Sequence, residues 1–231
     1  MTDLGIGEPS ALRVAIVGPS HPFKGGVAAH TTTLAHELAA AGHEVTLVSW
    51  SQLYPSLLYP GEQAIPGGDP DVEPFPRTIS ALSWARPDSW VRAGRRLADV
   101  DVIVVVHVIP PVVPAHLALL RAAGAGRPAG PGAPRAGPVT IAIAHNVLPH
   151  EARPGDRVLV ASFLRRVDAV LVHSAQQAAL ASSLGATRVR ALDLPPHLPG
   201  GPAVPHVEST GPVRLLALGL VRGYKGVDLL L

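Results

Sequence analysis

Four side chains that bind ligands or carry protons lie within seven residues of this sequence. The stretch AHNVLPHE (144–151) contains His145, Asn146, His150 and Glu151, and it follows the apolar run VTIAI, which is typical of a buried strand. Ligands of open parallel sheets bind beyond the carboxyl ends of the strands. The stretch therefore predicts a substrate-binding loop. The alternative is a polar loop whose Asn and His side chains only cap nearby backbone groups.

A second candidate is the glycine-rich turn of GPSHPFKGGVAAH (18–30), between an apolar run and a helical pattern. Gly25 and Gly26 allow a ligand to approach the backbone closely, and the first N–H groups of the helix could hold an anion. Lys24 precedes both glycines, so the P-loop order G-x-x-x-x-G-K-[ST] is not met, and the dinucleotide fingerprint G-x-G-x-x-G is also absent. A plain turn that needs a positive φ remains the alternative.

His107 is a third candidate, because it ends the apolar stretch VIVVVH (102–107). In a parallel sheet it would lie at the same edge as the glycine turn and His145, although a histidine beside a core strand can equally be structural. His145, His150 and Glu151 lack the H-E-x-x-H spacing of a helical zinc site, and the chain has no cysteine. We therefore predict no metal.

A fourth candidate is GLVRGYKG (219–226), where Arg222 and Lys225 lie beside a predicted helix start. Two cations in this position suit a diphosphate. The alternative is a solvated basic turn.

These candidates need a scaffold, and the hydrophobic pattern supplies one. Short apolar runs alternate with helical patterns, which predicts an α/β fold with a doubly wound parallel sheet and helices on both faces. We expect Asp88 or Ser89 to cap one helix and Ser174 to form a capping box with Gln177. The expected strands are 13–17, 43–50, 101–108, 139–146, 168–174 and 187–194, and the expected helices are 27–42, 87–100, 114–126, 156–167 and 174–185.

Composition divides the chain into one main domain and the start of another. Two Pro- and Gly-rich segments, 51–76 and 121–138, are expected to be surface loops. The expected division is a disordered N-terminus (1–12), a main domain (13–194), a linker (195–212) and the incomplete start of a second domain (213–231).

The overall composition excludes several classes of protein. Of the 231 residues 47% are hydrophobic, which excludes global disorder, and a formal net charge of +2 without a basic stripe argues against a nucleic-acid partner. No signal peptide is evident, and the longest apolar stretch (102–113) is too short to span a bilayer. We expect a cytoplasmic protein whose only membrane contact would be peripheral, at the inner membrane surface.

The motifs together resemble those of the retaining GT-B glycosyltransferases of family 4, from about residue 12 to the end. AHNVLPHE is similar to that family's H-N-x-x-P-H-E signature, and GPSHPFKGGVAAH is similar to its N-terminal glycine loop. DAVLVHSAQQAAL (168–180) resembles its V-x-x-S passage, and GLVRGYKGVDLLL (219–231) resembles the opening of its nucleotide-sugar domain. The composition also resembles that of actinobacterial members.

The resemblance implies two Rossmann-like domains facing each other across a cleft, the first holding the acceptor and the second a UDP- or GDP-sugar. The sugar would pass to a hydroxyl of a saccharide, lipid or small-molecule acceptor, with retention at the anomeric carbon and without a metal or other cofactor. Positive groups would stabilise the departing diphosphate. The implied catalytic residues are His107, Arg222 and Lys225, and the implied binding residues are Gly25, Gly26, His145, Asn146, His150 and Glu151.

The family's E-x7-E segment, which grips the donor, would lie beyond residue 231, so we expect little transfer by this chain alone. One alternative is therefore a non-catalytic fragment that binds an acceptor. Another is an NAD-dependent enzyme of doubly wound fold, against which the missing dinucleotide fingerprint argues.

Overall fold

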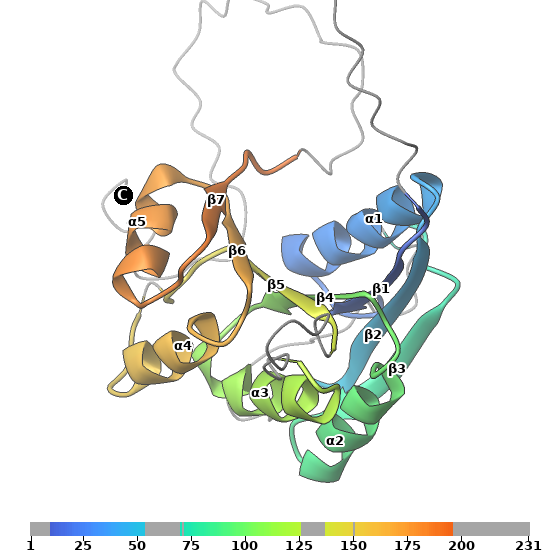
Figure 1. Cartoon of the computed structure of the whole chain (residues 1–231), viewed down its shortest axis with the longest axis horizontal. Helices are drawn as coiled ribbons and strands as arrows, with labels where there is room; N and C mark the ends of the chain where they lie inside the picture. Colours follow the sequence, from blue (N-terminus) through green and yellow to red (C-terminus); the bar gives the residue numbers. More distant parts are fainter. Residues whose placement is uncertain (1–9, 54–69, 71, 126–136, 150, 196–231) are drawn as a thin grey trace, which may run out of the picture. The chain divides into compact units, whose positions relative to one another are not determined.

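The computed structural model describes residues 10–53, 70, 72–125, 137–149 and 151–195. This part of the chain forms one seven-stranded sheet in which all neighbouring strands are parallel, in the order β3-β2-β1-β4-β5-β6-β7 (Figure 1). The strands are β1 (Arg13–Val17), β2 (Glu44–Gln52), β3 (Thr78–Ser83), β4 (Val102–His107), β5 (Val139–Ala144), β6 (Ala169–Val172) and β7 (Val189–Ala191).

Five α-helices of the described chain alternate with these strands, which confirms the predicted α/β fold. Their bounds are α1 (Gly26–Ala40), α2 (Pro87–Arg96), α3 (Val113–Ala122), α4 (Asp156–Leu164) and α5 (Ala175–Ser183), and a short 3-10 turn, η2 (Pro110–Val112), leads into α3. The architecture is Rossmann-like, with the chain switching direction across the sheet between β1 and β4.

Strict side-chain alternation divides the core into two layers. In β1, Ala15 and Val17 belong to one buried cluster, whereas Val14 and Ile16 belong to the other. The same division holds in β4, where Ile103 faces the first layer. Successive side chains of a strand point to opposite faces, so both faces of this sheet are apolar and must be covered.

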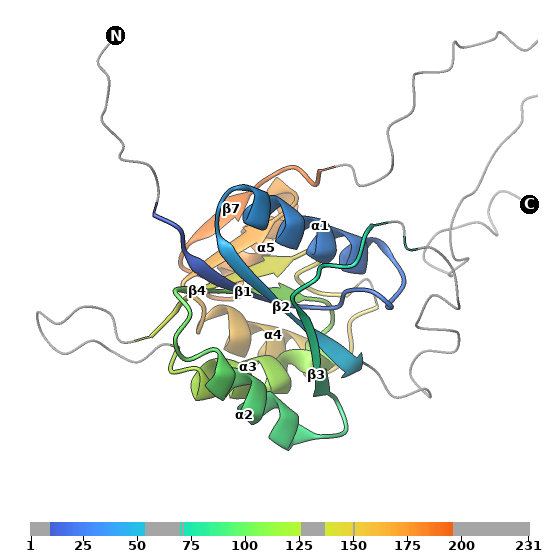
Figure 2. The ribbon, with the colours of Figure 1, turned by 90° about the vertical axis from the view of Figure 1, so that its right-hand side faces the viewer.

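Helices cover the two faces unequally. Side chains of α2, α3, α4 and α5 join the first cluster, while α1 contributes Ala35 and the half-buried Val27, Leu34 and Leu38 to the second. Figures 1 and 2 show α1 on one side of the sheet and α2, α3 and α4 on the other. Helices therefore lie on both faces of the sheet, as predicted.

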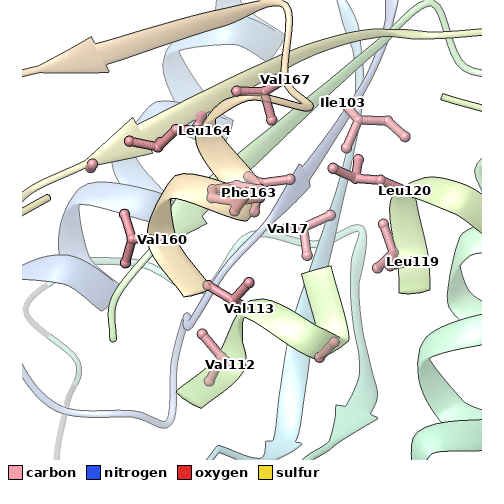
Figure 3. Packing of buried hydrophobic residues seen from close by; sticks show 14 of the residues in the cluster. Val17, Ile103, Val112, Val113, Leu119, Leu120, Val160, Phe163, Leu164 and Val167 are labelled. Carbon is pink, nitrogen blue, oxygen red and sulfur yellow. The ribbon is translucent and has the colours of Figure 1, made fainter. Parts of the chain in front are cut away.

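Phe163 of α4 is the largest fully buried side chain of the larger cluster after Trp50. Figure 3 shows it among side chains from α3 and from the sheet, including Val113, Leu120 and Val17. Burial of a side chain of this size contributes about 1.5–3 kcal/mol. The position of α4 against α3 follows from this packing.

Two carboxylates fix the amino edge of the sheet. Asp101, before β4, accepts hydrogen bonds from the Arg13 backbone N–H at 2.7 Å and from the Arg13 guanidinium at 3.1 Å. Asp168, before β6, accepts from the backbone N–H and hydroxyl of Thr140 at 2.8 and 2.7 Å. The Arg13 hydrogen bonds hold the pKa of Asp101 below its usual value. Each carboxylate thus links the starts of two neighbouring strands.

One strand was missed and one local prediction was wrong. No strand was predicted at 78–83, yet TISALS, which is short and mixes polar with apolar residues, pairs with β2 as the edge strand β3. Neither Asp88 nor Ser89 caps α2, which instead begins at Pro87 behind Arg86. Proline fits the first helical position because its missing N–H would have no helical partner there. The Ser89 hydroxyl instead accepts from Ser83 N–H and donates to the Arg86 carbonyl.

Other predictions lie outside the described residues. These are most of the loops 51–76 and 121–138, residues 1–9 of the N-terminus, the linker after residue 195 and the start of a second domain at 213–231.

Gly94 provides a test of the helix packing. A Cβ atom at this position would overlap the Leu119 carbonyl oxygen and come within 2.8 Å of the Ala122 Cβ, so α2 and α3 approach too closely for any side chain. We expect Gly94→Ala to lower the free energy of unfolding by about 1–3 kcal/mol, the cost of overpacking. Urea unfolding measures it, with the exposed neighbour Arg95→Ala as control. Equal stability of both variants would contradict this packing.

Candidate functional site

The carboxyl ends of the central strands meet at one edge of the sheet. Val17, the last residue of β1, pairs with Val105, and His107, the last residue of β4, pairs with Ala144 at the end of β5. The glycine turn, His107 and His145 all follow at this edge. The shared edge expected from a parallel sheet is therefore present.

Gly25 sets the conformation of the glycine turn. Its backbone angles, φ 102° and ψ 166°, are essentially restricted to glycine, and it caps α1 without a side-chain hydrogen bond. Beside it lies a small pocket of about 20 Å³ with His21, Phe23, Thr32 and Val72 in its wall. That volume holds about one water molecule and no sugar. The turn is thus specified by its backbone, and Gly26 follows as the first residue of α1.

His107 is a core residue in this structure. Its side chain is 1% exposed, and its ring centroid lies 6.1 Å from that of His116 and 5.7 Å from that of Phe163. Within the described residues neither ring nitrogen of His107 or His116 has a hydrogen-bond partner. Burial lowers the pKa of His107 to about 4, and burial together with the neighbouring His107 lowers that of His116 to about 3. Both imidazoles are therefore neutral at pH 7.

His145 lies on the opposite face from His107. In β4 the residues 103, 105 and 107 share the layer of α3 and α4, whereas in β5 the side chains of Ile141 and Ile143 face the α1 layer and His145 continues that series. The structure therefore brings His107 and His145 to one edge but not into one group.

His145 instead forms a cluster with two other histidines, His30 from α1 and His173 from the end of β6. The ring centroids of His30 and His145 lie 4.8 Å apart, those of His30 and His173 5.6 Å, and those of His145 and His173 4.9 Å. His30 meets both other rings edge to face, an arrangement that is favourable between rings, whereas His145 and His173 are tilted against each other. Through His30, the helix that begins at the glycine turn contacts the loop that follows β5.

The residues after His145 are held from α5. Gln177 Oε1 accepts a hydrogen bond from Val147 N–H at 2.7 Å, and Gln177 N–H donates to the Ser174 hydroxyl at 3.2 Å. The predicted Ser174 cap is thus confirmed. The Gln177 side chain does not complete the capping box, because it accepts its hydrogen bond from the loop after β5. Asn146, between the anchored positions, is exposed.

The structure does not describe three of the predicted site residues. His150, Arg222 and Lys225 lie outside the described residues, and Glu151 is exposed without a hydrogen bond to another described residue. No group of three metal-ligating side chains occurs in the part of the chain that the structure describes. In the same part, none of the helices has the length and apolar character needed to cross a membrane.

Sequence reasoning missed His30, His116 and His173 as partners of the predicted residues. The sequence did contain a signal for His173. It is the first residue after its strand, as His145 is after β5, so both side chains are expected on the same face of the sheet. His116 lies in α3, whose sequence pattern gives no indication that a histidine is fully enclosed.

Comparison with known proteins decides the family. The family model described as Glycosyltransferase Family 4 matches residues 24–192, from the glycine turn to the end of β7. The chain belongs to glycosyltransferase family 4. This family-4 chain has no significant match among curated protein sequences.

One solved structure supports the fold of this chain, and two further ones are similar over part of it. Sucrose-phosphate synthase from Thermosynechococcus elongatus is 14% identical, with a TM-score of 0.51 over 79% of this chain and 48% of that chain. Two structures of an alpha-glucosyltransferase in complex with UDP and a 13-mer DNA are also 14% identical, with TM-scores of 0.41 and 0.45 over 72% and 79% of this chain and 38% and 42% of theirs. The family-4 chain spans less than half the length of these structures.

The buried pair His107 and His116 predicts a pH-dependent stability. In the folded state the pKa values of both histidines lie below the ordinary value of 6.5. Below pH 6.5 the unfolded state therefore binds more protons than the folded state does. The penalty is absent above that pH and grows as pH falls toward 4. Between pH 8 and pH 5 we expect a loss of about 2 kcal/mol for each histidine.

Urea unfolding of the chain and of His116→Phe at both pH values measures this loss. The variant should lose about half as much stability as the parent, because only His107 remains to be protonated. An equal loss in both proteins would show that the buried pair is not the cause.

Proposed function

We propose that this family-4 chain forms the acceptor-side wall of a glycosyltransferase that moves a sugar from a nucleotide-sugar to an acceptor hydroxyl, with retention at the anomeric carbon. The observation that carries the proposal is the contact between His30 and His145, which joins the glycine turn to the loop after β5 at the carboxyl edge of the sheet. Ligands of open α/β sheets bind at this edge, beside the switch point.

Acceptor binding is assigned to the loop after β5 and to the glycine turn. Asn146 offers both a donor and an acceptor, and its side chain is exposed between residues that His30 and Gln177 hold. His145, His150 and Glu151 belong to the same stretch of sequence, and Gly25 and Gly26 are exposed at the start of α1, on the same edge of the sheet. This combination suits a polyhydroxylated acceptor, because sugar hydroxyls need both donors and acceptors.

His107 would act as a neutral group. With a pKa of about 4, its imidazole carries no charge at pH 7, so it can exchange hydrogen bonds with a sugar hydroxyl but cannot pair with phosphate as a cation. It is 1% exposed, so contact with the transferred sugar requires a rearrangement at the carboxyl edge.

Departure of the nucleoside diphosphate needs positive charge, and the proposal gives that part to Arg222 and Lys225. A guanidinium and an ammonium can neutralise charge that develops on the leaving phosphate. The proposed reaction uses no metal. The alternative is a non-catalytic protein that binds the acceptor with the same loop.

Binding and transfer can be tested on the same protein. Calorimetric titration of the chain with a panel of saccharides, UDP- and GDP-sugars and NAD should detect a saccharide or nucleotide-sugar ligand and no NAD. Asn146→Ala should weaken that binding about tenfold, the effect of about 1.4 kcal/mol from one lost hydrogen bond. Gly25→Ala should weaken it as well, because alanine does not adopt this backbone conformation.

Arg95→Ala, on an exposed face of α2, is the matched control and should bind as the parent does. Mass spectrometry of the same mixtures measures transfer directly: little or no transferred sugar is expected from this chain alone, and clear turnover of a UDP- or GDP-sugar would contradict that expectation and identify an enzyme. Binding of NAD alone, or equal binding by parent and Asn146→Ala, would contradict the proposal.

A further inference from the structure

A second cavity lies far from the carboxyl edge, between the ends of α3 and α4. Its volume is about 460 Å³, within the range of small-molecule sites. Figures 1 and 3 show α3 and α4 packed side by side, and both helices end where β5 and β6 begin, at the amino edge of the sheet. The cavity is lined by Leu117, Leu120, Arg121, Ala125, Arg165 and Arg166.

The charged side chains that line this cavity, among the described residues, are all positive. Arg121 comes from the last turn of α3, and Arg165 and Arg166 follow α4, so arginines from two helices line one cavity. No acidic side chain of the described chain lines it. The carboxylate nearest in sequence, Asp168, accepts two hydrogen bonds from Thr140.

Stabilisation of the helix C-termini explains the position of only one of these three arginines. Cations stabilise the carbonyl end of a helix, and Arg166 does so directly by donating to the Ser162 carbonyl oxygen at 2.6 Å. Within the described residues Arg121 and Arg165 make no ion pair and no side-chain hydrogen bond. Two guanidinium groups are therefore available to a ligand.

The other described residues that line the cavity are apolar. Leu120 is buried, and Leu117 and Ala125 are half-buried beside the arginines. A small inorganic anion would leave this wall exposed to water, whereas a ligand that carries both a negative group and an apolar group would cover both parts of the cavity.

We propose that this cavity binds an organic phosphate, with the phosphate oxygens accepting hydrogen bonds from Arg121 and Arg165 and the apolar group packed on Leu117 and Leu120. The planar guanidinium matches phosphate geometry and forms strong charge-assisted hydrogen bonds. The site lies at the opposite edge of the sheet from the proposed transfer site and does not depend on that function. The phosphate can come from a lipid headgroup or from a free phosphate ester.

Titration of the full chain with hexyl phosphate, inorganic phosphate and hexanol tests the proposal. Hexyl phosphate should bind more tightly than either of the other two. Arg121→Gln and Arg165→Gln should each weaken its binding about tenfold, because each removes one charge-assisted hydrogen bond. Arg95→Gln removes an exposed arginine that does not line the cavity, and it should bind as the parent does. Melting temperatures confirm that the variants fold.

Sedimentation with vesicles identifies the source of the phosphate. Binding to phosphatidylcholine vesicles that contain phosphatidic acid, lost in Arg165→Gln and absent with phosphatidylcholine alone, assigns a lipid headgroup. Binding of soluble hexyl phosphate without vesicle binding assigns a free ester. Equal affinity for inorganic and hexyl phosphate, equal weakening by Arg95→Gln, or no binding of hexyl phosphate would overturn the proposal.

Discussion

The pairing of β1 with both β2 and β4 is the interaction on which the rest of this structure depends. Both pairings are parallel, so the chain leaves β1, β4 and β5 in the same direction and at the same edge. The first two connections place β2 and β3 on one side of β1, and the connection after β3 crosses to β4 on the other side. Side chains from distant parts of the sequence therefore lie near one another where the strand order changes direction, between β1 and β4. The strand pairing alone brings them there.

Side-chain alternation then sorts these groups by face. Odd positions of β4 place His107 among α3 and α4, where burial keeps it neutral, whereas the end of β5 places His145 against α1. One edge thus carries two histidine environments: the fully buried pair His107 and His116, and a cluster of three rings in which His30 is buried and His145 and His173 are half-buried. A single-residue shift in the register of β5 would exchange the face of His145, so the strand pairing controls the chemistry of the edge.

Much of the scaffold could be predicted because buried parallel strands leave a strong signal. RVAIV and VIVVVH are continuous apolar runs, and both are strands within a residue of the predicted bounds. The edge strand β3 leaves no such signal, since only part of it is buried. The partners of His107 and His145 were not predictable from spacing, because His116 and His30 lie on helices whose rotation against the sheet is decided by packing.

The same reasoning explains the position of the loop after β5. Its sequence indicated a binding site, but its anchor, Gln177, was expected to complete a helix cap and instead accepts from Val147 N–H. A local pattern cannot show that a backbone N–H from thirty residues earlier in the chain competes for the same side-chain oxygen. Tertiary contact, rather than local preference, decides this hydrogen bond.

The central claim is that the carboxyl edge of the sheet is the ligand site of this family-4 chain. Backbone amide chemical shifts, recorded while the chain is titrated with saccharides and nucleotide-sugars, test it most directly. The account predicts that the amides that shift lie in the glycine turn at 18–30 and in the loop at 144–151. Shifts confined to the starts of the strands, with both of these segments unchanged, would contradict it.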